Sequence, residues 1–131
     1  MIGDKIEDPF VNTIYRNRIK YIHMNWIPLK TEEELNQILT SNVTAVIYKH
    51  STRCSVSLMA FKKLKMEGGL GDDYPYYIVD VIQDRPLSQH IAQVLQVQHE
   101  SPQILLIKDG QCIYNASHEE VSFSDISELV S

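Results

Sequence analysis

Strand-length apolar segments alternate along this chain with segments whose apolar residues recur at helical spacing. The apolar segments are short, as at 104–107, and fall well below the ~18 residues that a membrane-spanning helix needs. Strands that alternate with helices favour a largely parallel sheet covered by helices. The pattern therefore predicts an α/β fold before any individual residue is considered.

The predicted elements follow the order β-α-β-α-β-α-β-β-α. Thr31 and Glu34 have the spacing of a capping box, which starts the first helix. Asp109-Gly110 has the composition of a tight hairpin turn, so the last two strands are antiparallel and the sheet is mixed, flanked by helices. Strands are expected at 26–28, 44–48, 76–82, 104–107 and 112–116, and helices at 31–40, 54–67, 84–95 and 123–130.

The length of 131 residues fits one domain, and the net charge of −5 argues against a protein that binds nucleic acid through its phosphates. Residues 1–23 differ from the rest, because bases stand between apolar residues there. A short amphipathic helix over 10–22 that meets a partner or a membrane surface is one interpretation. We favour a poorly ordered extension, or a natural start at Met24, followed by one domain over 24–131.

Cysteine usage is sparse, because Cys54 and Cys112 are the only two in the chain. They are too few for a disulfide scaffold, and no Cys-x-x-Cys or Cys/His pair has zinc-ligand spacing. Asp4, Glu7 and Asp8 stand where the apolar stretch of a signal peptide would begin. We therefore expect a cytoplasmic protein with reduced cysteines and without a metal centre.

Cys54 is the main candidate for chemistry, because it follows a strand and the polar loop 50–53 and opens a helix. The free N–H groups of a first helical turn, with the helix dipole, stabilise an anion there. A thiolate at such a position has a lowered pKa and is nucleophilic, and Arg53 adds a positive charge beside it. The competing interpretation is an inert, buried cysteine. In the helix itself, Leu58, Phe61 and Leu64 (also Met59) recur at the spacing of a buried stripe.

Short motifs follow one another along the chain: Lys-His-Ser-Thr-Arg-Cys at 49–54, Tyr-Ile-Val-Asp-Val-Ile at 77–82, Asp-Arg-Pro at 84–86, His-Glu-Ser-Pro-Gln at 99–103, Leu-Ile-Lys-Asp-Gly at 106–110 and Ala-Ser-His at 116–118. In this order they are similar to the signatures of the bacilliredoxin family (YtxJ type) of the bacillithiol system, whose members have a thioredoxin fold. The resemblance covers the chain from Met24 to about Val121. So many ordered matches are specific, whereas Cys-x-x-Ser alone would be weak.

The resemblance implies a cytoplasmic thiol–disulfide oxidoreductase of the stress response. Its partners would be S-bacillithiolated proteins, with bacillithiol, an anionic thiol that carries a malate group, as co-substrate and no tightly bound cofactor. The Cys54 thiolate would take bacillithiol onto itself, and a second thiol would reduce Cys54 again. Dithiol relatives keep a cysteine where this chain has Ser57, so the implied mechanism is monothiol.

Further site residues are implied by the same resemblance. A cis peptide is expected between Ser101 and Pro102, which would leave the Ser101 backbone free to pair with a bound thiol or peptide. His118 would return to the active-site end on the last strand, and His99 would approach it from the loop before Pro102. Both are weaker candidates than Cys54, and His50 has a similar standing. Arg53 suits a carboxylate such as malate, because a guanidinium can bind it with two parallel hydrogen bonds, and the Ser57 hydroxyl or N–H can donate to the Cys54 thiolate.

Two positions depart from the pattern of the family or of thioredoxins, and the second cysteine has an expected place of its own. The motif around Cys54 lacks the proline that commonly follows the cysteine in the family, because Ser55 stands there. Tyr48 occupies the neighbourhood in which thioredoxins keep a buried carboxylate. Cys112 follows the far turn of the hairpin, so we expect it at the wrong end of the sheet to resolve a disulfide with Cys54.

Two other functions compete with this one. A thioredoxin-fold stress or adaptor protein with little turnover would keep the fold without the chemistry. Iron–sulfur handling is a third possibility, but monothiol glutaredoxins have Cys-Gly-Phe-Ser where this chain has Cys-Ser-Val-Ser at 54–57. No P-loop or paired metal motif supports phosphoryl transfer or metal hydrolysis.

Overall fold

The computed structural model describes residues 24–130, so the predictions for residues 1–23 lie outside the described residues. The described elements follow the predicted order, with one short 3-10 helix added before the last helix. They are β1 (Trp26–Pro28), α2 (Glu32–Thr40), β2 (Ala45–His50), α3 (Ser55–Glu67), β3 (Tyr76–Asp80), α4 (Arg85–Leu95), β4 (Gln103–Lys108), β5 (Gln111–Ser117), η2 (His118–Glu120) and α5 (Ser124–Val130).

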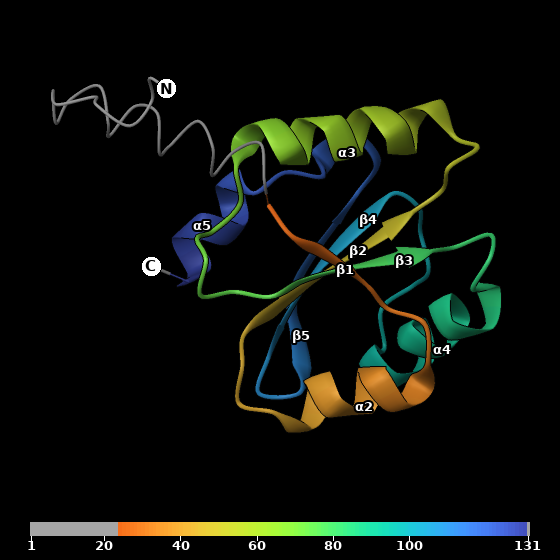
Figure 1. Ribbon diagram of the computed structural model, residues 1–131, viewed down its shortest axis with the longest axis vertical. Helices are drawn as coiled ribbons and strands as arrows, with labels where there is room; N and C mark the ends of the chain where they lie inside the picture. The colour runs from red at the N-terminus through yellow and green to blue at the C-terminus, as the bar shows by residue number, and fades with distance from the viewer. Residues whose placement is uncertain (1–23, 131) are drawn as a thin grey trace, which may run out of the picture.

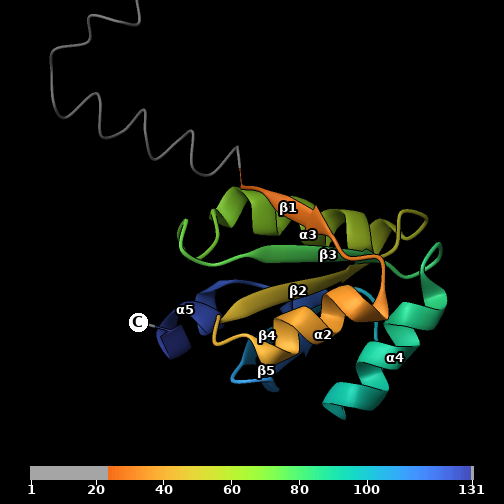
Figure 2. The same cartoon turned by 60° about the horizontal axis from the view of Figure 1, so that its bottom comes forward.

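The five strands form one mixed sheet in the order β1-β3-β2-β4-β5. Strands β1, β3 and β2 are parallel, whereas β4 is antiparallel to β2 and β5 is antiparallel to β4. Helices α2 and α4 cover one face of the sheet, and α3 and α5 cover the other (Figures 1 and 2). The predicted α/β class and the mixed sheet are therefore confirmed.

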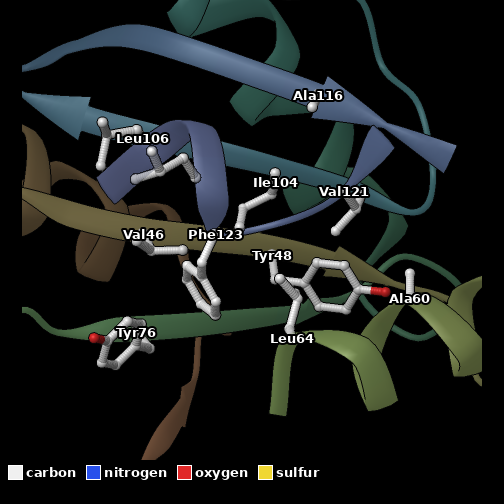
Figure 3. Close-up of a cluster of buried hydrophobic side chains, with 11 residues drawn as sticks. Val46, Tyr48, Ala60, Leu64, Tyr76, Ile104, Leu106, Ala116, Val121 and Phe123 are labelled. Atoms are coloured by element: carbon white, nitrogen blue, oxygen red, sulfur yellow. The ribbon is translucent and has the colours of Figure 1, made fainter. Parts of the chain in front are cut away.

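Strand β2 lies in the centre of the sheet and serves both hydrophobic cores, because successive side chains of a strand point to opposite faces. Val46 and Tyr48 belong to the core under α3 and α5 (Figure 3). Ala45 and Ile47 belong to the core under α2 and α4. The alternation places Lys49 on the α2 and α4 face.

The structure corrects two element boundaries. Strand β2 continues to His50, so His50 ends a buried strand and is not part of the polar loop. Strand β3 ends at Asp80, two residues before the predicted end, because the Asp80 carboxylate accepts the N–H groups of Ile82 (2.9 Å) and Gln83 (3.0 Å). These two hydrogen bonds turn the chain away from the sheet. The pattern of apolar residues alone does not indicate them.

The predicted buried stripe of α3 is wrong in part. Leu58 is 50% exposed and Met59 is 73% exposed, whereas Leu64 is fully buried and Phe61 packs partly buried against the core. The helix instead turns Ser57, Ala60 and Leu64 toward the sheet. Small residues at 57 and 60 let the start of α3 approach β2 closely, which places Cys54 at the end of that strand.

The hairpin between β4 and β5 depends on one glycine. Asp109 (φ 52°) and Gly110 (φ 75°) both have the positive φ values of a type I′ turn. A Cβ atom on Gly110 would stand 2.6 Å from the Leu39 carbonyl oxygen at the end of α2. The turn therefore needs glycine for two reasons, its backbone conformation and its contact with α2.

We expect Gly110→Ala to lower the free energy of unfolding by about 1–3 kcal/mol more than Gly71→Ala does. Gly71 also has a positive φ (120°), but a Cβ atom there would meet nothing within 4 Å. Gly71→Ala therefore reports backbone strain without a steric contact. Because φ 120° is less favourable for alanine than φ 75°, the difference is a lower bound on the effect of the contact with Leu39. Urea denaturation of both variants measures it, and an equal or smaller loss in Gly110→Ala would contradict the prediction.

Candidate active site

Cys54 occupies the N-cap position of α3, at the end of the short turn that leaves β2. Its N–H donates to the Ser51 carbonyl oxygen (3.3 Å), and its own carbonyl accepts the Leu58 N–H (3.1 Å). The first bond closes the turn and the second begins the helix. Cys54 therefore stands at the end of α3 where the N–H groups of the first turn have no partner within the helix, although its thiol makes no capping hydrogen bond to them.

These N–H groups act on the sulfur. The backbone N–H of Ser57 and then that of Val56 hold the pKa of the Cys54 thiol below its ordinary value, against a smaller opposing effect of burial. The Ser57 hydroxyl acts in the same direction, although it makes no hydrogen bond of ordinary geometry to a described protein atom. The geometry thus favours the thiolate, the form of cysteine that attacks a disulfide.

Tyr48 supports the first turn of α3 from below. Its buried hydroxyl donates to the Ser57 carbonyl oxygen (2.9 Å), and its ring stacks on Phe61 with centroids 5.4 Å apart. In Figure 3 the Tyr48 hydroxyl points toward α3 beside Ala60. Burial raises the pKa of Tyr48 above the physiological range, and the Cys54 charge adds to this shift. Tyr48 is therefore a hydrogen-bond donor that anchors the helix, whereas the carboxylate of a thioredoxin could accept a proton.

The Ser101–Pro102 peptide bond is cis, as the family resemblance implied. Strand β4 begins with the next residue, Gln103, which lies opposite Lys49 in the antiparallel pair of β4 and β2. Because β2 leads directly to the turn before Cys54, the Ser101–Pro102 segment lies at the same end of the sheet. The Ser101 hydroxyl oxygen is buried and has no hydrogen-bond partner among the described protein atoms.

His118 lies at this end of the sheet and contacts the proline segment. Its backbone N–H donates to the Pro102 carbonyl oxygen (2.9 Å), and its ring Nε2 lies 3.1 Å from Glu100 Oε1. The polar contact of its ring is therefore with Glu100. A role for His118 in holding the Cys54 thiolate stays a prediction.

The other polar candidates have separate surroundings. Arg53 is exposed beside Cys54 and forms no ion pair within residues 24–130. His50 is buried, and its ring lies against Tyr48 and Phe61, with centroids 5.5 and 5.1 Å away. Burial lowers the pKa of His50, which favours the neutral ring. His99 lies in the loop before Pro102, where its Nδ1 is 3.1 Å from Lys49 Nζ.

Cys112 lies at the opposite end of β4 from the Ser101–Pro102 segment, because it pairs with Ile107 while Gln103 pairs with Ser117. Its Sγ donates to the Tyr114 carbonyl oxygen (3.2 Å), and burial raises the pKa of its thiol. The predicted location is confirmed. Cys112 has the surroundings of a packing residue and not those of a reactive thiol.

Sequence reasoning missed Lys49 as a residue of this region. The available signal was a lysine directly after the apolar strand residues 45–48, and the structure buries all six residues of β2. Within residues 24–130, no group of three or more His, Cys, Asp or Glu side chains is placed to hold a metal ion. Among the described helices, none is long and apolar enough to cross a membrane.

Comparison with solved structures finds proteins of similar fold. A thioredoxin-fold protein proposed to be an oxidoreductase is 28% identical, with a TM-score of 0.71 over 81% of this chain and 94% of the other. Thioredoxin of Malassezia sympodialis is 17% identical, with a TM-score of 0.64 over 82% and 89% of the two chains. Mitochondrial thioredoxin 3 of Saccharomyces cerevisiae is 21% identical, with a TM-score of 0.59 over 76% and 87%.

The two thioredoxins support the fold alone, since their identity with this chain is low. The family comparison is more specific, because the model of the monothiol bacilliredoxin BrxC matches residues 27–126, which include Cys54, Ser57 and the cis proline. The chain therefore belongs to the monothiol bacilliredoxin family, whose chemistry and fold indicate a thiol redox function.

Proposed function

We propose that this protein removes bacillithiol from S-bacillithiolated proteins through a mixed disulfide at Cys54. The observation that carries the proposal is the Cys54 thiol at the N-cap of α3, where the Ser57 and Val56 N–H groups lower its pKa. Family membership supports bacillithiol as the thiol that is transferred. The return of Cys54 to the thiol form needs a reducing compartment such as the cytoplasm.

The reaction has two steps with balanced electrons. First, the Cys54 thiolate attacks the bacillithiol sulfur of the mixed disulfide, a new Cys54–bacillithiol disulfide forms, and the target cysteine leaves as a thiolate that takes a proton from water. Second, the thiolate of a low-molecular-weight thiol attacks the bacillithiol sulfur on Cys54 and oxidises to a disulfide with bacillithiol. Cys54 then leaves as the thiolate that the helix N–H groups stabilise.

Three other residues have proposed roles around the sulfur. Arg53 is exposed beside Cys54, where a guanidinium can bind the carboxylates of the malate group. The Ser57 N–H stabilises Cys54 as nucleophile in the first step and as leaving group in the second. The Ser101 backbone, next to the cis proline, would pair with the bound thiol or with the peptide that carries it.

Intact-mass spectrometry tests the proposal after the reduced protein is mixed with an S-bacillithiolated substrate. We expect a bacillithiol adduct on Cys54 and release of the reduced substrate. Both results should disappear in Cys54→Ala and persist in Cys112→Ala, because Cys112 is partly buried at the other end of the sheet and its thiol has a raised pKa. Cys112→Ala is thus the matched control for the loss of a thiol.

A folded wild-type protein that forms no adduct and releases no substrate would overturn the proposal. The fold assignment would stand, and the adaptor function would become the better explanation. An adduct that also disappears in Cys112→Ala would instead contradict the monothiol mechanism.

A further inference from the structure

Lys49 is a buried cation on the central strand of the sheet, one residue before β2 ends. Its side chain is fully buried, and no carboxylate of residues 24–130 lies within ion-pair distance of it. Its Nζ donates to the Ser88 carbonyl oxygen of α4 (2.9 Å) and lies 3.1 Å from His99 Nδ1. Burial of an unpaired charge is costly, and an apolar side chain at this position would avoid that cost.

The contact with Lys49 fixes the state of the His99 ring. An ammonium group has only donors, so Nδ1 must accept the hydrogen bond and the ring proton must reside on Nε2. The Ser88 hydroxyl lies 3.2 Å from the same Nδ1, so the two donors share its single lone pair in a bifurcated hydrogen bond. Burial and the Lys49 charge both lower the pKa of His99, which keeps the ring neutral. Lys49 and Ser88 therefore orient one imidazole from two different elements.

The loop that contains His99 is tethered along most of its length. The Gln98 carbonyl oxygen accepts a hydrogen bond from Gln103 Nε2 (3.0 Å). His99 contacts Lys49 and Ser88. Glu100 contacts the ring of His118, and the Pro102 carbonyl oxygen accepts the His118 N–H. Ser101 differs from its neighbours, because its buried hydroxyl has no partner among the described atoms. The tethers thus hold the loop on both sides of Ser101, whose backbone is the group proposed to pair with the bound thiol.

We propose that Lys49 is a positioning residue that, through His99, holds the 98–102 loop so that Ser101 can receive the disulfide bound at Cys54. The inference rests on the proposed function for the identity of that disulfide. Lys49 itself touches neither the sulfur nor the substrate. Lys49 fixes the loop side of the site from β2. The hydrogen bond from Tyr48 of β2 to Ser57 fixes the α3 side.

The test separates positioning from stability. Lys49→Met keeps the length of the side chain and removes the charge and the donor. We expect its KM for the S-bacillithiolated substrate to rise about tenfold, because a displaced binding loop costs affinity for the bound disulfide. Alkylation of Cys54 by iodoacetamide should stay within about twofold of wild type, because that small reagent does not need the loop. The melting temperature should not fall.

Two further variants make the test specific. His99→Asn keeps an acceptor oxygen near the position of Nδ1, whereas His99→Leu keeps none, so the KM should rise less in His99→Asn. Tyr76→Phe is the structural control, because the Tyr76 hydroxyl lies away from the site, where it accepts the Leu70 N–H (2.7 Å) and donates to the Gly71 carbonyl oxygen (2.8 Å). It should lower the melting temperature and leave the KM unchanged.

A Lys49→Met variant with the KM of wild type would overturn the inference, as would equal KM values in the two His99 variants. Failure of the proposed function has a different signature, because wild type itself would then not react with the S-bacillithiolated substrate. In that case an aryl disulfide with a coloured leaving thiol serves as the substrate, and the comparison of wild type with Lys49→Met decides the inference.

Discussion

Replacement of Ser57 by cysteine should convert this protein from a monothiol into a dithiol enzyme. The Cys54–bacillithiol adduct that accumulates in wild type should be replaced by a protein two hydrogens lighter than its reduced form, with an internal disulfide between residues 54 and 57. The position favours this result, since Ser57 lies in the first turn of the helix that Cys54 caps, and the buried Ser57 hydroxyl has no hydrogen-bond partner among the described atoms. Cysteine also differs little from serine in size.

The expected effect is large because the second thiol would be held beside the first. The new thiol attacks the Cys54 sulfur, an internal disulfide forms, and bacillithiol leaves as a thiolate that water protonates. An intramolecular reaction of this kind avoids the entropy loss of bringing in an external thiol, so we expect the adduct to decay about a hundredfold faster or more.

Time-resolved intact-mass spectrometry without added reductant measures the decay. Ser57→Ala is the matched control, because it removes the hydroxyl without adding a thiol, and its adduct should persist as in wild type. A Ser57→Cys adduct as long-lived as that of wild type would show that side chains at 54 and 57 do not meet, contrary to the described first turn of α3.

The sequence predicted those elements whose signals are local. The capping box is present as expected, with the Glu34 N–H bonded to Thr31 Oγ1 (3.1 Å) and the Thr31 N–H to Glu34 Oε1 (3.0 Å). The hairpin turn at Asp109 follows from its composition in the same way. Cys54 was found because a loop, a cysteine and a helix start are adjacent in the chain, and the N-cap follows from that adjacency alone.

The parts that were missed or misplaced depend on the register of the sheet. Lys49 becomes a residue of the site only because β4 pairs with β2 so that Gln103 lies opposite it. His99 and His118 lie in the predicted region, but their partners, Lys49 and Glu100, come from tertiary contacts that spacing does not encode. The exposure of Leu58 likewise follows from how α3 docks on the sheet, whereas apolar periodicity alone predicts that Leu58 is buried.

The free energy of unfolding should depend on pH because of the buried Lys49. Burial lowers the pKa of Lys49 from 10.5 to about 8, so between these values the unfolded chain binds more protons than the folded one. Stability that depends on Lys49 must therefore rise as the pH rises through this window. Below pH about 8 the full cost of the buried charge is present, and above 10.5 neither state carries the charge.

Comparison with Lys49→Met isolates this effect, because the other groups that titrate in the same range are common to both proteins. At neutral pH we expect Lys49→Met to be at least as stable as wild type. Between pH about 8 and 10.5 the free energy of unfolding of wild type should rise relative to that of the variant by at most about 3 kcal/mol, and by less if water reaches the amine. Urea denaturation at several pH values measures the difference.

Parallel stability profiles for the two proteins would show that Lys49 keeps an ordinary pKa, and the cation would then not be desolvated in the folded state. If the two stability profiles converge as the pH rises, the free-energy cost of the Lys49 charge is distinguished from the contribution of its hydrogen bonds. The uncharged amine still has two hydrogens, one for the Ser88 carbonyl and one for His99 Nδ1, so the tether to the 98–102 loop does not need the proton. Its charge therefore costs stability across a range of pH in which its contacts, and the loop that they hold, stay the same.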